Sequence, residues 1–74
     1  GIDFAFAARI FDADTLEWDD DRQDYGERRV VAVGCVEDLI LTVVYTARRG
    51  VLRIISARRA SRRERRAYLQ TFGR

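Results

Sequence analysis

The stretch from residue 53 to residue 70 is dominated by arginine and reads RIISARRASRRERRAYLQ. Seven of its eighteen residues are arginine, and a single one, Glu64, is acidic. Because the guanidinium group stays charged at any working pH and binds phosphate bidentately, such a cluster suits a phosphodiester backbone. Cleavage of RNA by its own 2′-hydroxyl would also need a proton acceptor, charge stabilisation at the phosphate and a proton for the leaving oxygen.

Side chains for this chemistry are present on a predicted helix. Ser61 followed three residues later by Glu64 forms a capping box, which predicts that the helix begins here. Glu64, Arg65 and Tyr68 share one side of that helix, and Glu64 or Tyr68 would exchange protons. Ordinary structural roles are equally open, because Glu64 is the capping partner, Tyr68 can be core and the helix arginines can be a solvated face.

Three arginines precede the helix on a predicted strand. Period-two alternation places Arg53 and Arg59 on one face of the strand and Arg58 on the other. Any of them, or Arg65 on the helix, would hold the charge of a phosphorane. On residue chemistry alone, both polyanion binding and metal-free RNA cleavage remain open.

The composition excludes several kinds of site. The chain has no histidine, so Ser-His-Asp and Cys-His catalysis are excluded within it. With a single cysteine, Cys35, it has neither an internal disulfide nor a Cys/His zinc site, and we expect Cys35 to be structural. Three consecutive acids, Asp19 to Asp21, lack the glutamate of a calcium loop, so we expect a solvated loop there.

Charge is strongly polarised along the chain. The net charge of +2 divides into −7 over residues 1–27, +2 over residues 28–50 and +7 over residues 51–74, and all fourteen cationic side chains are arginine. This asymmetry favours a nucleic acid or another polyanion as partner. No apolar run is long enough to cross a membrane, and we expect a cytoplasmic protein.

Periodicity predicts the elements that position these residues. A first helix is expected over residues 1–11, with Asp3 as its cap and an apolar face formed by Phe4, Ala7, Ala8 and Phe11. Strands are expected over residues 15–18, 28–36, 39–46 and 51–59, the third being central. Residues 61–72 form the closing helix, whose stripe of Tyr68, Leu69 and Phe72 packs on the sheet. For Trp18 and Phe4 a place in the core is expected rather than a ligand-stacking role.

The fold class is therefore α+β, an antiparallel meander with an N-terminal and a C-terminal helix, in a single domain over residues 1–74. The runs DDRQDYGERRVVAVG and LTVVYTARRGVLRIISARRASRRERRAY resemble the BrnT family of bacterial type II toxins, which have a RelE-like ribonuclease fold. The matching blocks are residues 21–22, 25–28, 44–46, 53–60 and 64–66. The similarity covers nearly all of the 74 residues, and the pattern I-S-A-R-R-A-[ST]-x-x-E-R is quite specific.

The resemblance implies an RNA-cleaving toxin that blocks translation and needs no metal or cofactor. It also implies neutralisation by a BrnA-like antitoxin with a ribbon-helix-helix domain, the complex repressing its own operon through DNA contacts of the antitoxin. Family members usually begin with a short strand and a helix ending in Lys-His-Gly. This chain starts at the position of that glycine, so we expect the strand and the helix to be absent.

These observations define two groups of site residues. The catalytic candidates are Arg53, Arg58, Glu64, Arg65 and Tyr68. The RNA-binding candidates are Arg59, Arg62, Arg63 and Arg66. The alternative function is a non-catalytic, arginine-rich nucleic-acid-binding module, or an interaction protein whose basic face docks an acidic partner.

Overall fold

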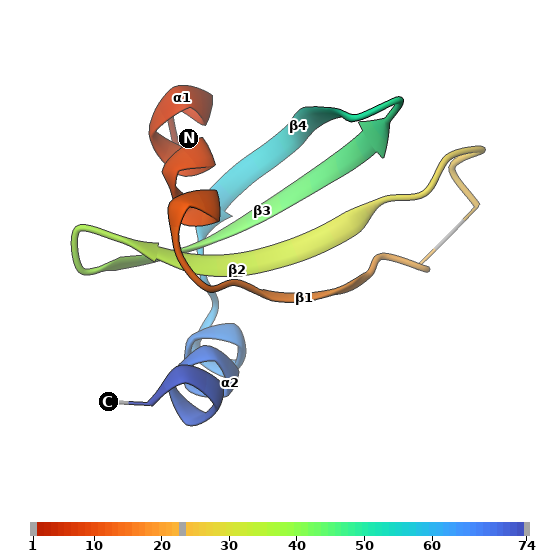
Figure 1. Ribbon diagram of the computed structural model, residues 1–74. Coiled ribbons are helices and arrows are strands. Elements are labelled where there is room, and N and C mark those ends of the chain that lie inside the picture. Colours follow the sequence, from red (N-terminus) through yellow and green to blue (C-terminus); the bar gives the residue numbers. More distant parts are fainter. Residues whose placement is uncertain (1, 23, 74) are drawn as a thin grey trace.

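The computed structural model describes residues 2–22 and 24–73; Gly1 of the predicted first helix, Gln23 of the predicted acidic loop and Arg74 lie outside the described residues. Its elements follow the predicted α+β order (Figure 1). They are α1 (Phe4–Ala7), the 3₁₀-helix η1 (Ala8–Asp12), β1 (Leu16–Asp19), β2 (Val30–Val36), β3 (Leu39–Arg48), β4 (Val51–Arg59) and α2 (Arg62–Phe72). No helix of the described part is long and apolar enough to span a membrane.

The strands form one antiparallel sheet in the order β1-β2-β3-β4. Tight turns at Glu37–Asp38 and Arg49–Gly50 connect β2 to β3 and β3 to β4, and all four turn residues have positive φ. Six of the ten residues of β3 are buried and the strand lies between β2 and β4, which confirms the prediction of a central strand. The predicted meander is confirmed.

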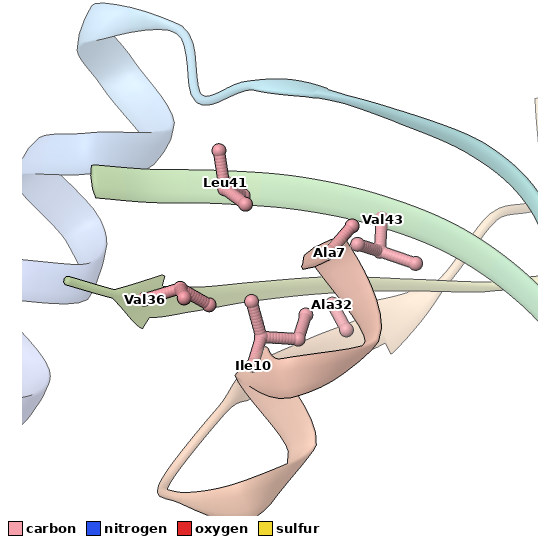
Figure 2. Packing of buried hydrophobic residues seen from close by; sticks show 6 residues of the cluster. All are labelled: Ala7, Ile10, Ala32, Val36, Leu41 and Val43. Atoms are coloured by element: carbon pink, nitrogen blue, oxygen red, sulfur yellow. The ribbon is translucent and has the colours of Figure 1, made fainter. Parts of the chain in front are cut away.

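The two sheet faces are covered by different helices, which lie on opposite sides of the sheet (Figure 1). On the α1 face, the buried cluster consists of Ala7, Ile10, Ala32, Val36, Leu41 and Val43 (Figure 2). Gly34 allows η1 to approach closely, because a Cβ added there would lie 2.6 Å from the Cβ of Ile10. On the α2 face, Tyr68 packs with Val33 and Ile40.

The N-terminal helix presents a different apolar face from the one predicted. Phe6 and Phe11 pack against the core with Ala7 and Ile10, whereas Phe4 is 46% exposed. The α-helix changes to a 3₁₀-helix after four residues, so an apolar stripe extrapolated at α-helical spacing does not follow the core. The prediction that Phe4 is core was wrong, although the Asp3 cap is confirmed by a bond from Ala5 N–H.

Two aromatic side chains on the α2 face also differ from prediction. Trp18, predicted as core, is 41% exposed because it lies on the edge strand β1, outside the apolar cluster under α2. Phe72 is 37% exposed and packs on Tyr68, with ring centroids 5.0 Å apart, rather than filling the sheet interface. Leu69 packs on the α2-face cluster as expected.

Candidate functional site

Arg58, at the end of β4, forms a bidentate ion pair with Glu64 in the first turn of α2. Its two terminal nitrogens lie 2.7 and 2.8 Å from the two carboxylate oxygens. One carboxylate oxygen also accepts from the hydroxyl of Thr42 at 2.9 Å and from the backbone N–H of Ser61 at 2.8 Å. The Ser61 hydroxyl accepts from the Glu64 N–H, so the predicted capping box is confirmed and is continuous with the ion pair.

These contacts fix the charge state of the pair. The pKa of Glu64 is lowered to about 2, chiefly by the hydrogen bond from Arg58 and also by those from Ser61 and Thr42, despite partial burial. The same pairing raises the pKa of Arg58. Glu64 therefore stays ionised near neutrality, with both oxygens bonded. In this arrangement it is a positioning group for Arg58 and a poor proton carrier.

A β-bulge interrupts the alternation of β4. Val44 pairs with Ser56, but the next residue of β3, Tyr45, pairs with Ile54. Ile55 is therefore an extra residue on β4, which shifts every residue before it to the opposite face from the one that simple alternation assigns.

The bulge corrects the predicted faces of the three strand arginines. Arg53 and Arg58 pair with Thr46 and Thr42, which lie on one face of β3 because they are four residues apart. That is the α2 face. Arg59 pairs with a residue of the core cluster under α1 and so belongs to the other face. The prediction that Arg53 and Arg59 share a face was wrong, and Arg53 and Arg58 are the pair that the sheet brings together.

A groove opens on the α2 face beside the first turn of α2. It is a cavity of about 180 Å³, here called the arginine groove, and its lining residues are Trp18, Asp19, Asp20, Asp21, Arg22, Val31, Val44, Arg58 and Glu64. A second cavity of about 320 Å³ lies further along the same face and is lined by Glu27, Arg29, Thr46, Arg53, Ile54 and Ile55. Arg53 and Arg58 thus line two neighbouring parts of one surface.

The acidic loop contributes an arginine that the sequence analysis missed. The carboxylate of Asp20 accepts from Arg22 at 2.8 and 2.9 Å, and its side chain is only 2% exposed. Its backbone N–H donates to the carbonyl of Arg29 at 2.8 Å. The hydrogen bond from Arg22 lowers the pKa of Asp20. The prediction of a wholly solvated loop was therefore wrong at Asp20. The sequence signal for the Asp20–Arg22 pair is the Asp-x-Arg spacing directly after a strand.

The other helix candidates lie away from the arginine groove. Tyr68 and Arg65 line a separate cavity of about 370 Å³ with Cys35 and Asp14. The Tyr68 ring is buried, and its hydroxyl donates to the backbone carbonyl of Asp14 at 3.3 Å. The half-buried thiol of Cys35 packs on the core. The cavity holds none of the groups that contact the Arg58–Glu64 pair.

The remaining arginines of α2 form an exposed cationic surface. Arg63 is exposed in the first turn of the helix. Arg62, Arg65 and Arg66 line a shallow surface cavity of about 370 Å³ with Leu69 and Gln70. In the described part of the chain, no three histidine, cysteine or acidic side chains are placed to hold a metal ion.

Comparison with known proteins identifies one family. Residues 1–64 match the family model described as "Ribonuclease toxin, BrnT, of type II toxin-antitoxin system". The match contains the whole sheet and ends at Glu64, so it includes Arg53 and Arg58, while Arg65 and Tyr68 lie beyond it. Neither the search of curated proteins nor that of solved structures finds a match.

Proposed function

The chain belongs to the BrnT family of ribonuclease toxins of type II toxin–antitoxin systems, and from this premise we propose that the α2 face of its sheet is the RNA-cleaving surface. The observation that carries the proposal is the position of Arg58. The half-buried carboxylate of Glu64 holds this arginine at the rim of the arginine groove, while Arg53 lies on the same face.

Arg58 is suited to stabilise a phosphorane. Its NH1 group donates to Glu64 and to the carbonyl of Arg59, and its NH2 group donates once to Glu64. A guanidinium has five N–H donors, so the Nε–H and one N–H of NH2 remain beyond these contacts for an anion. Since the ion pair fixes the guanidinium before substrate binds, little reorganisation is needed when charge develops.

We assign the reaction to attack by the RNA 2′-hydroxyl on the adjacent phosphate. The 2′ oxygen forms a bond to phosphorus, the 5′ oxygen of the next nucleotide leaves, and a 2′,3′-cyclic phosphate and a 5′-hydroxyl result. Arg58 stabilises the charge on the phosphate oxygens, Glu64 orients Arg58, and Arg53 binds the backbone further along the face. The helix arginines Arg62 and Arg63 extend the cationic surface.

The low pKa of Glu64 and the buried position of Tyr68 favour water as the carrier of both protons. Arg65 and Tyr68 line the separate cavity beside Cys35, where we propose that Arg65 binds RNA and Tyr68 supports the helix. This scheme uses no metal ion, because arginine supplies the positive charge that a metal would otherwise provide.

We further propose that cleavage inhibits translation in the cytoplasm, and that a BrnA-like antitoxin with a ribbon-helix-helix domain neutralises it. The net charge of +7 over residues 51–74 suits an acidic segment of such a partner. Operator DNA would then be contacted through the antitoxin.

The experiment is an incubation of purified protein with RNA in EDTA, beside the same RNA carrying 2′-O-methyl groups. We expect 2′,3′-cyclic phosphate ends from the first substrate and none from the second. Cleavage of the methylated RNA, or cleavage that requires added Mg²⁺, would contradict the proposed chemistry. Intact RNA that binds with a steep salt dependence would instead establish the non-catalytic binding module.

A further inference from the structure

Trp18, the only tryptophan of the sequence, is exposed at the surface of the domain. It pairs with Val31, whose side chain lies on the α2 face, so the indole projects from the same face as Arg58. It is 41% exposed, whereas Val33 and Ile40 on the same face, under α2, are buried. Trp18 is thus an aromatic surface in the wall of the arginine groove.

The sheet register places Trp18 one row away from the proposed phosphate site. Trp18, Val31 and Val44 form one cross-strand row, and Arg58 belongs to the next row on the same face. Val31 and Val44 are each 8% exposed and form an apolar floor. Because Trp18 and Arg58 line the same cavity from its two sides, a flat apolar group seated on this floor would contact both.

The charges of the groove favour a base rather than a second phosphate beside Trp18. Three of its four carboxylates already have arginine partners, those of Asp19, Asp20 and Glu64. The groove is lined by four carboxylates and two arginines, so its net charge is negative, which weakens attraction for a second phosphate. The carboxylate of Asp21 can instead accept hydrogen bonds from the N–H groups of a nucleobase. An aromatic ring flanked by arginine is a typical platform for unpaired bases.

We propose that Trp18 is a nucleobase-stacking residue, and that the arginine groove binds one unpaired base of single-stranded RNA next to the phosphate held by Arg58. The inference rests on the proposed function and specifies its substrate, because a base in a duplex is stacked on its neighbours and cannot enter the groove. RNA would then be bound in single-stranded segments, with the indole fixing the register of the scissile phosphate.

The test uses Trp18 itself as the reporter, since the chain has no other tryptophan. The full chain is titrated with a non-cleavable 2′-O-methyl RNA oligonucleotide and with an abasic oligonucleotide of the same length, each labelled for anisotropy. We expect the base-bearing probe to quench tryptophan emission and the abasic probe to bind without quenching. Binding of the base-bearing probe with unchanged emission would overturn the inference.

Substitutions of Trp18 and of a control residue distinguish a loss of base stacking from a loss of folding. Trp18→Ala is expected to weaken affinity for the base-bearing probe by about 5- to 150-fold, and Trp18→Phe by about threefold or less. Phe4→Ala, which removes an equally exposed ring outside the groove, is the matched control and should bind like wild type. If Trp18→Ala binds the base-bearing probe with wild-type affinity, the inference is overturned. If that variant also fails to bind an antitoxin, the indole belongs to the protein interface instead.

Failure of the inference and failure of the proposed function give different results. If Trp18→Ala binds and cleaves RNA like wild type, the stacking role is wrong and the ribonuclease stands. If wild type neither binds the probes nor cleaves RNA, the ribonuclease proposal fails, and with it the inference.

Discussion

Replacing Glu64 by glutamine tests the electrostatic core of the site. Glutamine has nearly the same shape and is accepted in a capping box, so the contact with Ser61 can persist. The charge that pairs with Arg58 is lost. In the folded protein the pKa of Glu64 is lowered from 4.5 to about 2. At about 1.4 kcal/mol for each pKa unit, this difference is worth at most about 3.5 kcal/mol.

The measured effect is expected to be smaller than this limit. The side chain of Glu64 is 15% exposed, but that of Arg58 is 53% exposed, so solvent screens part of the interaction. We therefore expect Glu64→Gln to lower the free energy of unfolding by about 1–2 kcal/mol at pH 7. Because the folded pKa is the lower one, this stabilisation is complete above pH 4.5 and is lost as the pH falls towards 2.

The assay is urea unfolding followed by circular dichroism at several pH values between 7 and 2.5. Glu37→Gln is the matched control, because Glu37 pairs with Arg9 on the surface, with side chains 62% and 50% exposed. Its loss should be about 0.5 kcal/mol or less. Equal stability of Glu64→Gln and wild type at pH 7, or a difference that stays constant down to pH 2.5, would refute the reasoning.

Three further substitutions test a contact of the site and the packing of the helices on both faces of the sheet. Thr42→Val removes a buried donor to Glu64 and should cost about 1.5–3 kcal/mol in urea unfolding; a loss below about 0.5 kcal/mol would show that the bond contributes little. Tyr68→Phe should cost about 1 kcal/mol and leave RNA cleavage within about threefold, whereas a hundredfold loss of cleavage would place the hydroxyl in the chemistry. Gly34→Ala puts a Cβ 2.6 Å from Ile10 and should cost about 1–3 kcal/mol; an unchanged melting temperature would contradict the close packing.

The fold was largely predictable because its signals are local. The limits of β4 follow from the turn at Gly50 and the capping box at Ser61, and the structure has both. The short connections forced neighbouring strands to pair. The packing of the N-terminal helix was less predictable, because which of its aromatic side chains contact the core depends on how the helix lies against the sheet.

The site was predictable in its members but not in its arrangement. Arg58 and Glu64 were both identified, yet their pairing depends on how α2 meets the sheet. The shared face of Arg53 and Arg58 depends on a β-bulge at Ile55. No residue type in β4 predicts this bulge. The burial of Asp20 is likewise a tertiary effect, because its residue type alone favours solvent.

The central claim is that Arg58 stabilises the reacting phosphate, and RNA cleavage by Arg58→Ala tests it most directly. Arg48→Ala, at the exposed end of β3, removes the same charge and is the control. Circular dichroism first establishes that both variants are folded. We then expect the rate of RNA cleavage to fall by about 10²- to 10³-fold in Arg58→Ala and by about threefold or less in Arg48→Ala. Cleavage by Arg58→Ala at the wild-type rate, or an equal loss in both variants, would contradict the account.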